Sequence, residues 1–195
     1  MHIDGRMAVM ISPEYWPEET SGTTQIHPEL SLWNEVHFQV DDYKGYNVTG
    51  TIRLHGKRLE LDELSVHRID NGKEITGYGL RELQPPAMIR QSLWVLLNYP
   101  PDGEFLDVEI DDRGVSNIVA RGLSTDEELE AAKAAGPSSQ QLLKLVSRIY
   151  VGAQAVQDRP AKVIQEAFGV SPRTAGNWIA KSKAAGYIEA GEHSA

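Results

Sequence analysis

Alternating hydrophobic and polar residues predict three consecutive β-strands in the first half of the chain. Apolar side chains occupy every second position in residues 33–41 and again in residues 46–55. Residues 58–69 alternate as well, but the phase changes midway, so we expect a β-bulge near Asp62-Glu63. Gly56-Lys57 is typical of a tight turn between the second and third strands. The pattern predicts a three-stranded antiparallel meander with one apolar face.

Helical patterns follow the meander. Residues 80–98 are rich in apolar residues, and Pro85-Pro86 is expected at the start of a helix that covers the sheet, because missing amide donors cost little there. Ser124 and Glu127 have the spacing of a capping box for a short helix over residues 125–135. A short strand is predicted where three apolar residues lie close together: Phe105, Val108 and Ile110.

The last part of the chain is predicted to form three helices. Ser138 with Gln141 resembles a second capping box, and the apolar residues that follow it have helical spacing. A second helix is expected over 160–168, where Gly169 ends it because glycine readily adopts the left-handed conformation. A third helix is expected over 172–185, after the cap residue Ser171.

The second and third of these helices have the spacing of a helix-turn-helix. Relative to the turn glycine, this motif requires apolar residues at five fixed positions, and all five are present: Ile164, Phe168, Val170, Ala175 and Trp178. The position four residues before the glycine is usually small, whereas this chain has Gln165. The pattern predicts a tri-helical DNA-binding unit.

The third helix also carries a polar face that suits the major groove. Arg173 can offer two donors to a guanine edge, and Asn177 can pair with an adenine edge. Small residues between them would let the helix approach the bases, whereas hydroxyls and lysines would bind phosphate. The predicted DNA-binding residues are Ser171, Arg173, Thr174, Gly176, Asn177, Lys181 and Lys183.

Charge divides the chain into two parts. The net charge is −9, yet residues 139–195 carry seven basic and four acidic residues, a net of +3. The remaining 12 basic and 24 acidic residues give the rest a net of −12. With Gly136-Pro137 as the boundary, we expect an irregular arm over 1–30, an α+β domain over 31–136 and a helix-turn-helix domain over 137–195.

Composition narrows the remaining classes of function. The chain has no cysteine, which excludes disulfides and thiol nucleophiles and suits a reducing compartment. No apolar run is long enough to span a membrane, and no signal peptide is expected, so we predict a cytoplasmic protein without a membrane partner. No phosphate-binding loop or nucleophile elbow occurs, so no enzyme activity and no cofactor are expected.

Two sets of residues are candidates for a metal site. Three histidines lie on the polar faces of the predicted strands, namely His37, His55 and His67, but a solvated face explains them better than a metal. The acidic runs lack the spacing of a calcium loop, so solvated turns and helix starts explain them. No metal ligand is predicted.

Residues 160–188 resemble helix-turn-helix proteins of actinobacteria and their phages. The shared elements are Gly169-Val170-Ser171, Thr174-Ala175, Trp178-Ile179 and Ala185-Gly186-Tyr187. These residues belong to the C-terminal module, roughly residues 138–188, which is about a quarter of the chain, and the N-terminal meander followed by a helix is similar to the usual layout of these proteins. The resemblance implies a phage or host DNA-binding protein, most simply a transcription regulator, and implies no ligand or target site.

We therefore expect a sequence-specific regulator that binds double-stranded DNA. One such unit covers few base pairs, so specificity predicts a homodimer formed through the N-terminal domain. An alternative is an adaptor whose acidic N-terminal domain recruits another protein to DNA. A third hypothesis is a small-molecule sensor with a pocket between the sheet and the helix over 80–98.

Overall fold

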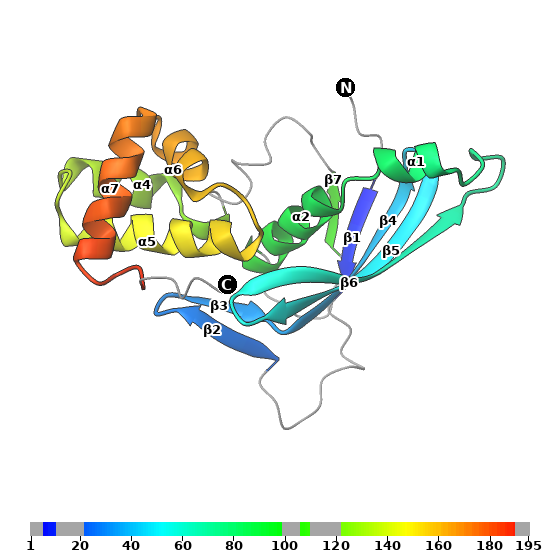
Figure 1. Ribbon diagram of the computed structural model, residues 1–195, viewed down its shortest axis with the longest axis horizontal. Helices are drawn as coiled ribbons and strands as arrows, with labels where there is room; N and C mark the ends of the chain where they lie inside the picture. Colours follow the sequence, from blue (N-terminus) through cyan, green and yellow to red (C-terminus); the bar gives the residue numbers. More distant parts are fainter. Residues whose placement is uncertain (1–5, 11–21, 99–105, 110–121, 190–195) are drawn as a thin grey trace.

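The computed structural model describes residues 6–10, 22–98, 106–109 and 122–189. In this part of the chain, an antiparallel sheet forms one half of the molecule and a group of helices forms the other, with α2 (Pro85–Asn98) between them (Figure 1). The α+β architecture with an N-terminal antiparallel sheet and C-terminal helices is therefore confirmed.

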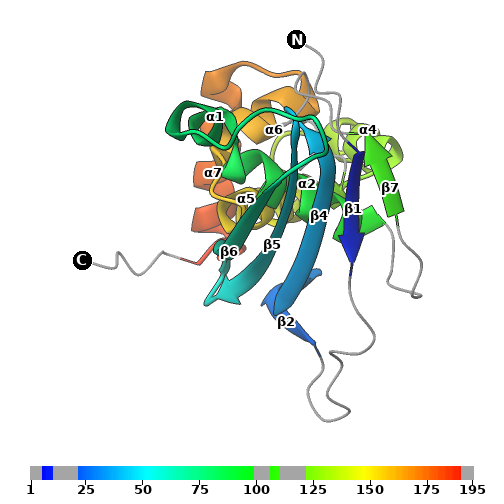
Figure 2. The ribbon, with the colours of Figure 1, turned by 90° about the vertical axis from the view of Figure 1, so that its right-hand side faces the viewer.

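The main sheet has five strands in the order β6-β5-β4-β1-β7, and every neighbouring pair is antiparallel (Figure 2). Its strands are β1 (Arg6–Met10), β4 (Glu35–Tyr43), β5 (Tyr46–His55), β6 (Arg58–Arg68) and β7 (Leu106–Glu109). Among the strands of the described residues, β6 and β7 lie at the two ends of this order, so each of them has a neighbouring strand on one side only.

The predicted meander is confirmed as β4, β5 and β6. The predicted bulge is also found, since Thr51 faces Glu63 while the next residue, Ile52, faces Leu61, which leaves Asp62 as the extra residue. Gly56 has a φ of 62° in the turn between β5 and β6, a conformation that glycine adopts without strain. The bulge keeps the apolar residues of β6 on one face despite the change of phase in the sequence.

The prediction of an irregular arm over residues 1–30 is wrong for two segments. Residues 6–10 form β1, the strand that joins β4 to β7 in the sheet. Residues 23–27 form β2 (Thr23–His27), which pairs with β3 (Leu30–Trp33) in a separate two-stranded sheet. The five residues of β1 are too few to show a clear periodicity, whereas their pairing partners lie far away in the chain.

The single helix expected over 80–98 is two helices. The first, α1 (Gly77–Glu82), begins after its cap Thr76 and ends at Leu83, whose backbone is extended. The second, α2, begins at Pro85, as the prolines predicted. Met88 and Leu93 of α2 are fully buried in the same core as the apolar face of the sheet, so the predicted cover is confirmed.

Four helices lie within the described residues 126–189. They are α4 (Asp126–Ala134), α5 (Gln140–Ala155), α6 (Pro160–Phe168) and α7 (Pro172–Ala184). The capping residues of the first two lie one position later than predicted, because Thr125 with Glu128 forms the capping box of α4 and Ser139 caps α5. The limits of α6 agree with the prediction, and those of α7 agree to within one residue.

The helices and the sheet share a continuous core of buried residues that runs from Ile26 in β2 to Trp178 in α7. Helix α4 precedes the boundary predicted at residue 136, yet it packs against α5 and α6. Arg148 of α5 connects three elements, since its guanidinium lies 2.8 Å from Glu128 of α4 and 3.4 Å from Glu29 in the turn after β2. None of the helices in the described ranges combines the length and the apolar character needed to cross a bilayer.

Candidate nucleic-acid interface

The turn between α6 and α7 is built by local backbone chemistry. Gly169 ends α6 with φ and ψ of 62° and 35°, the left-handed conformation expected for this position. Two residues later Ser171 caps α7, where its Oγ accepts a hydrogen bond from the Thr174 amide at 3.1 Å. Pro172 occupies the first helical position, where its missing N–H is not needed.

The buried side of α7 fixes this helix against α5 and α6. Ala175 and Trp178 are buried, and the Trp178 ring packs edge-on against Phe168 with centroids 5.2 Å apart. Ser182 is also buried, and its Oγ donates a hydrogen bond of 3.0 Å to the carbonyl of Leu143 in α5. Four of the five apolar positions predicted for the motif are buried, and Val170 is half-buried.

The opposite side of α7 is exposed. Arg173, Gly176, Asn177 and Ala180 all lie on it, and among the described residues neither Arg173 nor Asn177 makes a side-chain hydrogen bond or ion pair. Apart from its chain neighbours and the backbone of α7 itself, no atom of the described residues lies within 4 Å of the position that a Cβ of Gly176 would occupy. The exposed side therefore carries two long polar side chains that can extend outward, and the same side holds the small residues Gly176 and Ala180.

The two lysines of the predicted set flank the point where α7 crosses α5. They are two positions apart in the sequence, so they lie about 200° apart around the helix axis. Lys181 Nζ is 2.8 Å from Ser138 Oγ and 3.2 Å from the carbonyl of Pro137, before the start of α5. Lys183 Nζ lies 5.3 Å from the centroid of the Tyr150 ring, further along α5. Both lysines remain exposed, one at each edge of the outward face of α7.

The predicted residues at the start of α7 are brought together. Ser171 and Thr174 are one helical turn apart, and their hydroxyl oxygens lie 2.9 Å from each other. Ser171 caps the helix and Thr174 lies in its first turn, where the backbone N–H groups and the helix dipole favour an anion. The structure thus places five of the predicted residues at the start and on the outer side of the helix: Ser171, Arg173, Thr174, Gly176 and Asn177. The other two, Lys181 and Lys183, lie at the edges of the outer side.

Sequence reasoning did not identify Ser182 as the residue that fixes the crossing of α7 over α5. Its position was readable, because residues 175, 178 and 182 have the spacing of one helix face, and two of them were predicted to be buried. Nor did it identify Tyr150, whose contact with Lys183 joins residues on different helices and has no local signal.

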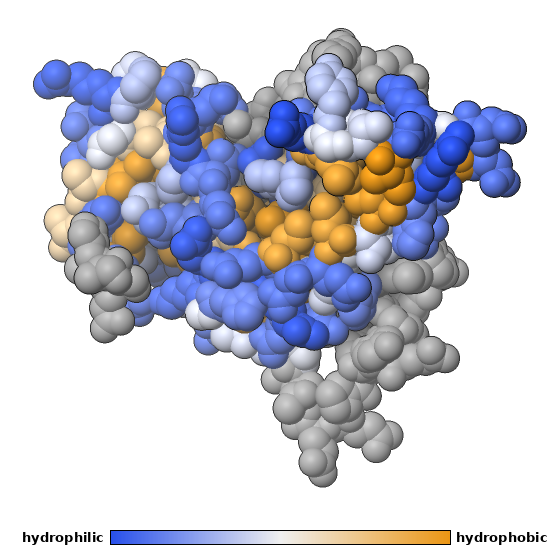
Figure 3. Space-filling model, turned by 45° about the vertical axis from the view of Figure 1, so that its right-hand side comes forward, coloured by the Kyte–Doolittle hydropathy of each residue, from blue (hydrophilic) through white to orange (hydrophobic). Residues whose placement is uncertain are grey.

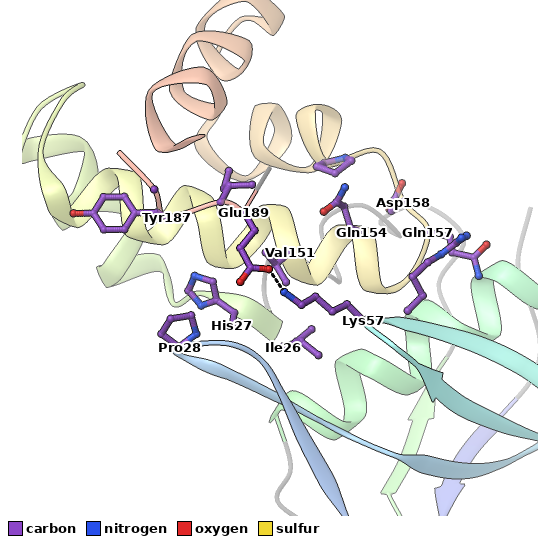
Figure 4. Close-up of a pocket in the computed structure, with 14 residues that line it drawn as sticks. Ile26, His27, Pro28, Lys57, Val151, Gln154, Gln157, Asp158, Tyr187 and Glu189 are labelled. Atoms are coloured by element: carbon purple, nitrogen blue, oxygen red, sulfur yellow. Dashed lines mark hydrogen bonds and ion pairs between the residues drawn. The ribbon is translucent and has the colours of Figure 1, made fainter. Parts of the chain in front are cut away.

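A separate groove of about 700 Å³ lies between the two halves of the molecule, lined by β2, the turn between β5 and β6, α5 and the segment after α7. Figure 4 shows Lys57 and Glu189 pointing toward each other across it, and the two side chains form an ion pair. The Lys57 ammonium holds the pKa of the Glu189 carboxyl below its usual value, through a hydrogen bond and its charge. This groove differs in place from the pocket expected between the sheet and α2.

The polar face of the sheet holds the histidines considered in the sequence. His37 lies 3.0 Å from Glu35, and His55 lies 3.0 Å from Asp62, in two separate pairs. Among the residues whose positions are described, no group of three or more histidine, aspartate or glutamate side chains is arranged to hold a metal ion.

Comparisons of the chain with protein-family models, with curated proteins and with solved structures gave no match.

Proposed function

We propose that α5, α6 and α7 form a helix-turn-helix unit that binds double-stranded DNA, with α7 in the major groove. The observation that carries this proposal is the division of α7 into two sides. Trp178 and Ser182 hold one side rigidly in the core, while Arg173 and Asn177 extend from the other without partners among the described residues. A helix held in this way presents a fixed set of donors and acceptors to a ligand.

The chemistry of the exposed side suits base edges and phosphates. The guanidinium of Arg173 can donate two hydrogen bonds to a guanine, and the amide of Asn177 can pair with an adenine. Gly176 and Ala180 add little bulk, so the helix axis can approach the floor of the groove. Ser171, Thr174 and the first-turn amides suit one phosphate, and Lys181 and Lys183 are placed for phosphates on either side.

The charge distribution favours a sequence-specific regulator over a general DNA-coating protein. The last 57 residues have a net charge of +3, whereas the rest of the chain has a net charge of −12. The acidic part repels phosphate, which weakens binding that depends on charge alone and leaves base contacts to set the affinity. We therefore propose regulation of transcription from defined DNA sites.

The proposal is tested by the binding of a fluorescently labelled 30-base-pair duplex of mixed sequence, followed by anisotropy at two salt concentrations. Arg173→Glu should weaken binding at least about tenfold, since it replaces an attractive charge with a repulsive one next to DNA. Arg81→Glu is the matched control, because Arg81 is exposed on α1, away from α7. It should change the affinity by less than about twofold.

Equal effects of the two variants, or no binding by the unchanged protein at low salt, would overturn the proposal. The adaptor hypothesis gives a third pattern. It predicts that duplexes of unrelated sequence bind with the same affinity, whereas a regulator discriminates among them.

A further inference from the structure

β6 forms one edge of the main sheet, and half of this edge is open. In the described part of the chain, its only partner strand is β5. At its beginning the edge is covered, since Gln157 Nε2 donates a hydrogen bond of 3.2 Å to the carbonyl of Leu59. After the bulge at Asp62, no backbone hydrogen bond from another element reaches residues 63–68 within the described ranges. An open edge of this kind presents unpaired backbone N–H and C=O groups to another strand.

The apolar rows of the sheet continue to this edge and end there only partly covered. One row runs from Val40 through Val48 to Val66, and the next runs from Phe38 through Gly50 to Leu64. Their members on β4 and β5 are fully buried, but Leu64 and Val66 on β6 are half-buried.

Two large apolar residues that follow β6 in the chain, Ile75 and Leu80, are 41% and 44% exposed. Figure 3 shows a patch of hydrophobic residues on the half of the molecule that contains the main sheet. The apolar face of the sheet is thus only partly covered at its β6 edge. Burying this hydrophobic surface against a partner would be favourable.

Charge changes sign along the open part of β6. Glu63 lies toward one end and His67 toward the other, with Ser65 midway between them. An antiparallel copy of the same strand would place the acidic end of each against the basic end of the other. The partner that best complements this edge is therefore the edge itself.

We propose that β6 pairs antiparallel with β6 of a second copy of this chain, about a two-fold axis at Ser65 that is normal to the sheet. This axis keeps the apolar faces of both sheets on the same side, as an isologous interface requires. In this register Leu64 faces the partner's Val66, and Glu63 faces the partner's His67. The two five-stranded sheets then form one continuous sheet of ten strands.

Neighbouring registers lack this complementarity. Moving the axis to Leu64 would place Glu63 opposite the uncharged Ser65, so that no opposite charges meet within the open part of the edge. Moving it to Val66 would place Leu64 opposite the charged Arg68. Only the axis at Ser65 pairs apolar with apolar and acidic with basic residues, and opposite charges facing each other across a sheet are stabilising.

The interface is tested by sedimentation of the full chain at micromolar concentration, where the dimer has twice the monomer mass of 21.6 kDa. Glu63 and His67 are exposed and lie opposite the uncharged Thr51 and Asn47 on β5, so they can be exchanged without disturbing the sheet. His67→Glu places two acidic residues opposite each other twice in the dimer. It should weaken dimerisation by on the order of tenfold.

The double variant Glu63→Lys with His67→Glu restores opposite charges in the same register and should restore the dimer. Circular dichroism and the Tm of each variant confirm that the monomer remains folded. A monomeric unchanged protein, or a dimer that His67→Glu does not weaken, would overturn the proposed interface. A dimer that His67→Glu weakens and the double variant leaves weak would overturn the register. The measurement uses no DNA, so its result is independent of the proposed function.

Discussion

The Nε2 atom of His27 lies 2.9 Å from the Oγ atom of Ser147, and this buried contact joins β2 to α5. The Ser147 hydroxyl donates its proton to the carbonyl of Lys144 at 2.7 Å, so it must accept from His27. On the other side of the ring, Nδ1 accepts a hydrogen bond from the Glu29 amide at 3.2 Å. The neighbours thus fix one neutral tautomer, with its proton on Nε2.

This contact predicts a loss of stability in mild acid. Burial lowers the pKa of His27, the carboxylate of Glu29 opposes this shift, and the charges of Arg148 and Lys57 add to it. In the unfolded chain the pKa of a histidine is about 6.5, so His27 binds a proton more readily there than in the folded protein. The stabilisation is therefore complete above about pH 6.5 and is lost as the pH falls toward the folded-state pKa. Urea denaturation at pH 7.5 and at pH 5.5 measures the difference.

The matched variant is His27→Gln, whose amide can still donate to Ser147 but does not titrate. It should be less stable at pH 7.5 and should lose less stability between the two pH values than the unchanged protein. All other residues are the same in both proteins, so the comparison isolates the contribution of His27. An identical pH dependence in the two proteins would contradict the assignment.

Two glycines of the α6–α7 region are predicted to respond to alanine in opposite directions. Gly169 has a φ of 62°, and a Cβ there costs about 1 kcal/mol even though no atom obstructs it. Gly176 is in the exposed middle of α7 with open space around it, so alanine should stabilise by about 0.5–1 kcal/mol. Chemical denaturation of both variants checks the signs, and two changes of the same sign would contradict this account of the turn.

Gly176 also separates stability from DNA binding. Glutamine fits the helix at this position and keeps it folded, but its side chain stands where α7 is proposed to approach the groove. Gly176→Gln should therefore weaken DNA binding at least about tenfold without lowering the Tm. Ala134→Gln, on the exposed side of α4, is the control and should leave binding unchanged. Unchanged binding by Gly176→Gln would remove this face from the interface.

Ser182 is predicted to stabilise the crossing of α7 over α5. Ser182→Ala removes a buried hydrogen bond to Leu143 and leaves that carbonyl without this donor, at a cost of about 1 kcal/mol in the free energy of unfolding. Ser31→Ala, on an exposed position of β3, should change it by less than about 0.5 kcal/mol. Equal values for the two variants would show that the hydroxyl has no such role.

Much of this architecture was predictable from local patterns. The alternation in residues 33–69 predicted β4, β5 and β6, and the change of phase located the bulge at Asp62. Glycine, proline and serine around residues 169–172 predicted the limits of the turn, because each acts on its own backbone. Caps were misplaced by one residue where two candidates are adjacent, as at Ser138 and Ser139.

Contacts between distant segments were not predictable. β1 joins the sheet through β4 and β7, and its five residues carry no distinctive pattern of their own. The contacts of Lys181 with residues 137 and 138, and of Lys183 with Tyr150, depend on how α7 crosses α5. The exposed face of α7 was nevertheless readable, since the helical period places Arg173 and Asn177 opposite Ala175 and Trp178.

The two kinds of basic residue on α7 are predicted to act differently. Arg173→Ala should reduce discrimination at one base pair by roughly 1–3 kcal/mol, because it removes a contact to a base edge. Lys183→Ala should weaken all sequences alike and reduce the slope of log K against log salt by about one. Equal losses of discrimination from both variants would contradict these roles.

The most direct test of the central claim is selection of duplexes from a random library by the full-length protein at near-physiological salt, read by sequencing. The account predicts an enriched motif with two half-sites in inverted orientation, and a loss of preference at one position of each half-site with Arg173→Ala. No enrichment, together with binding that disappears as salt rises, would contradict sequence-specific recognition by α7.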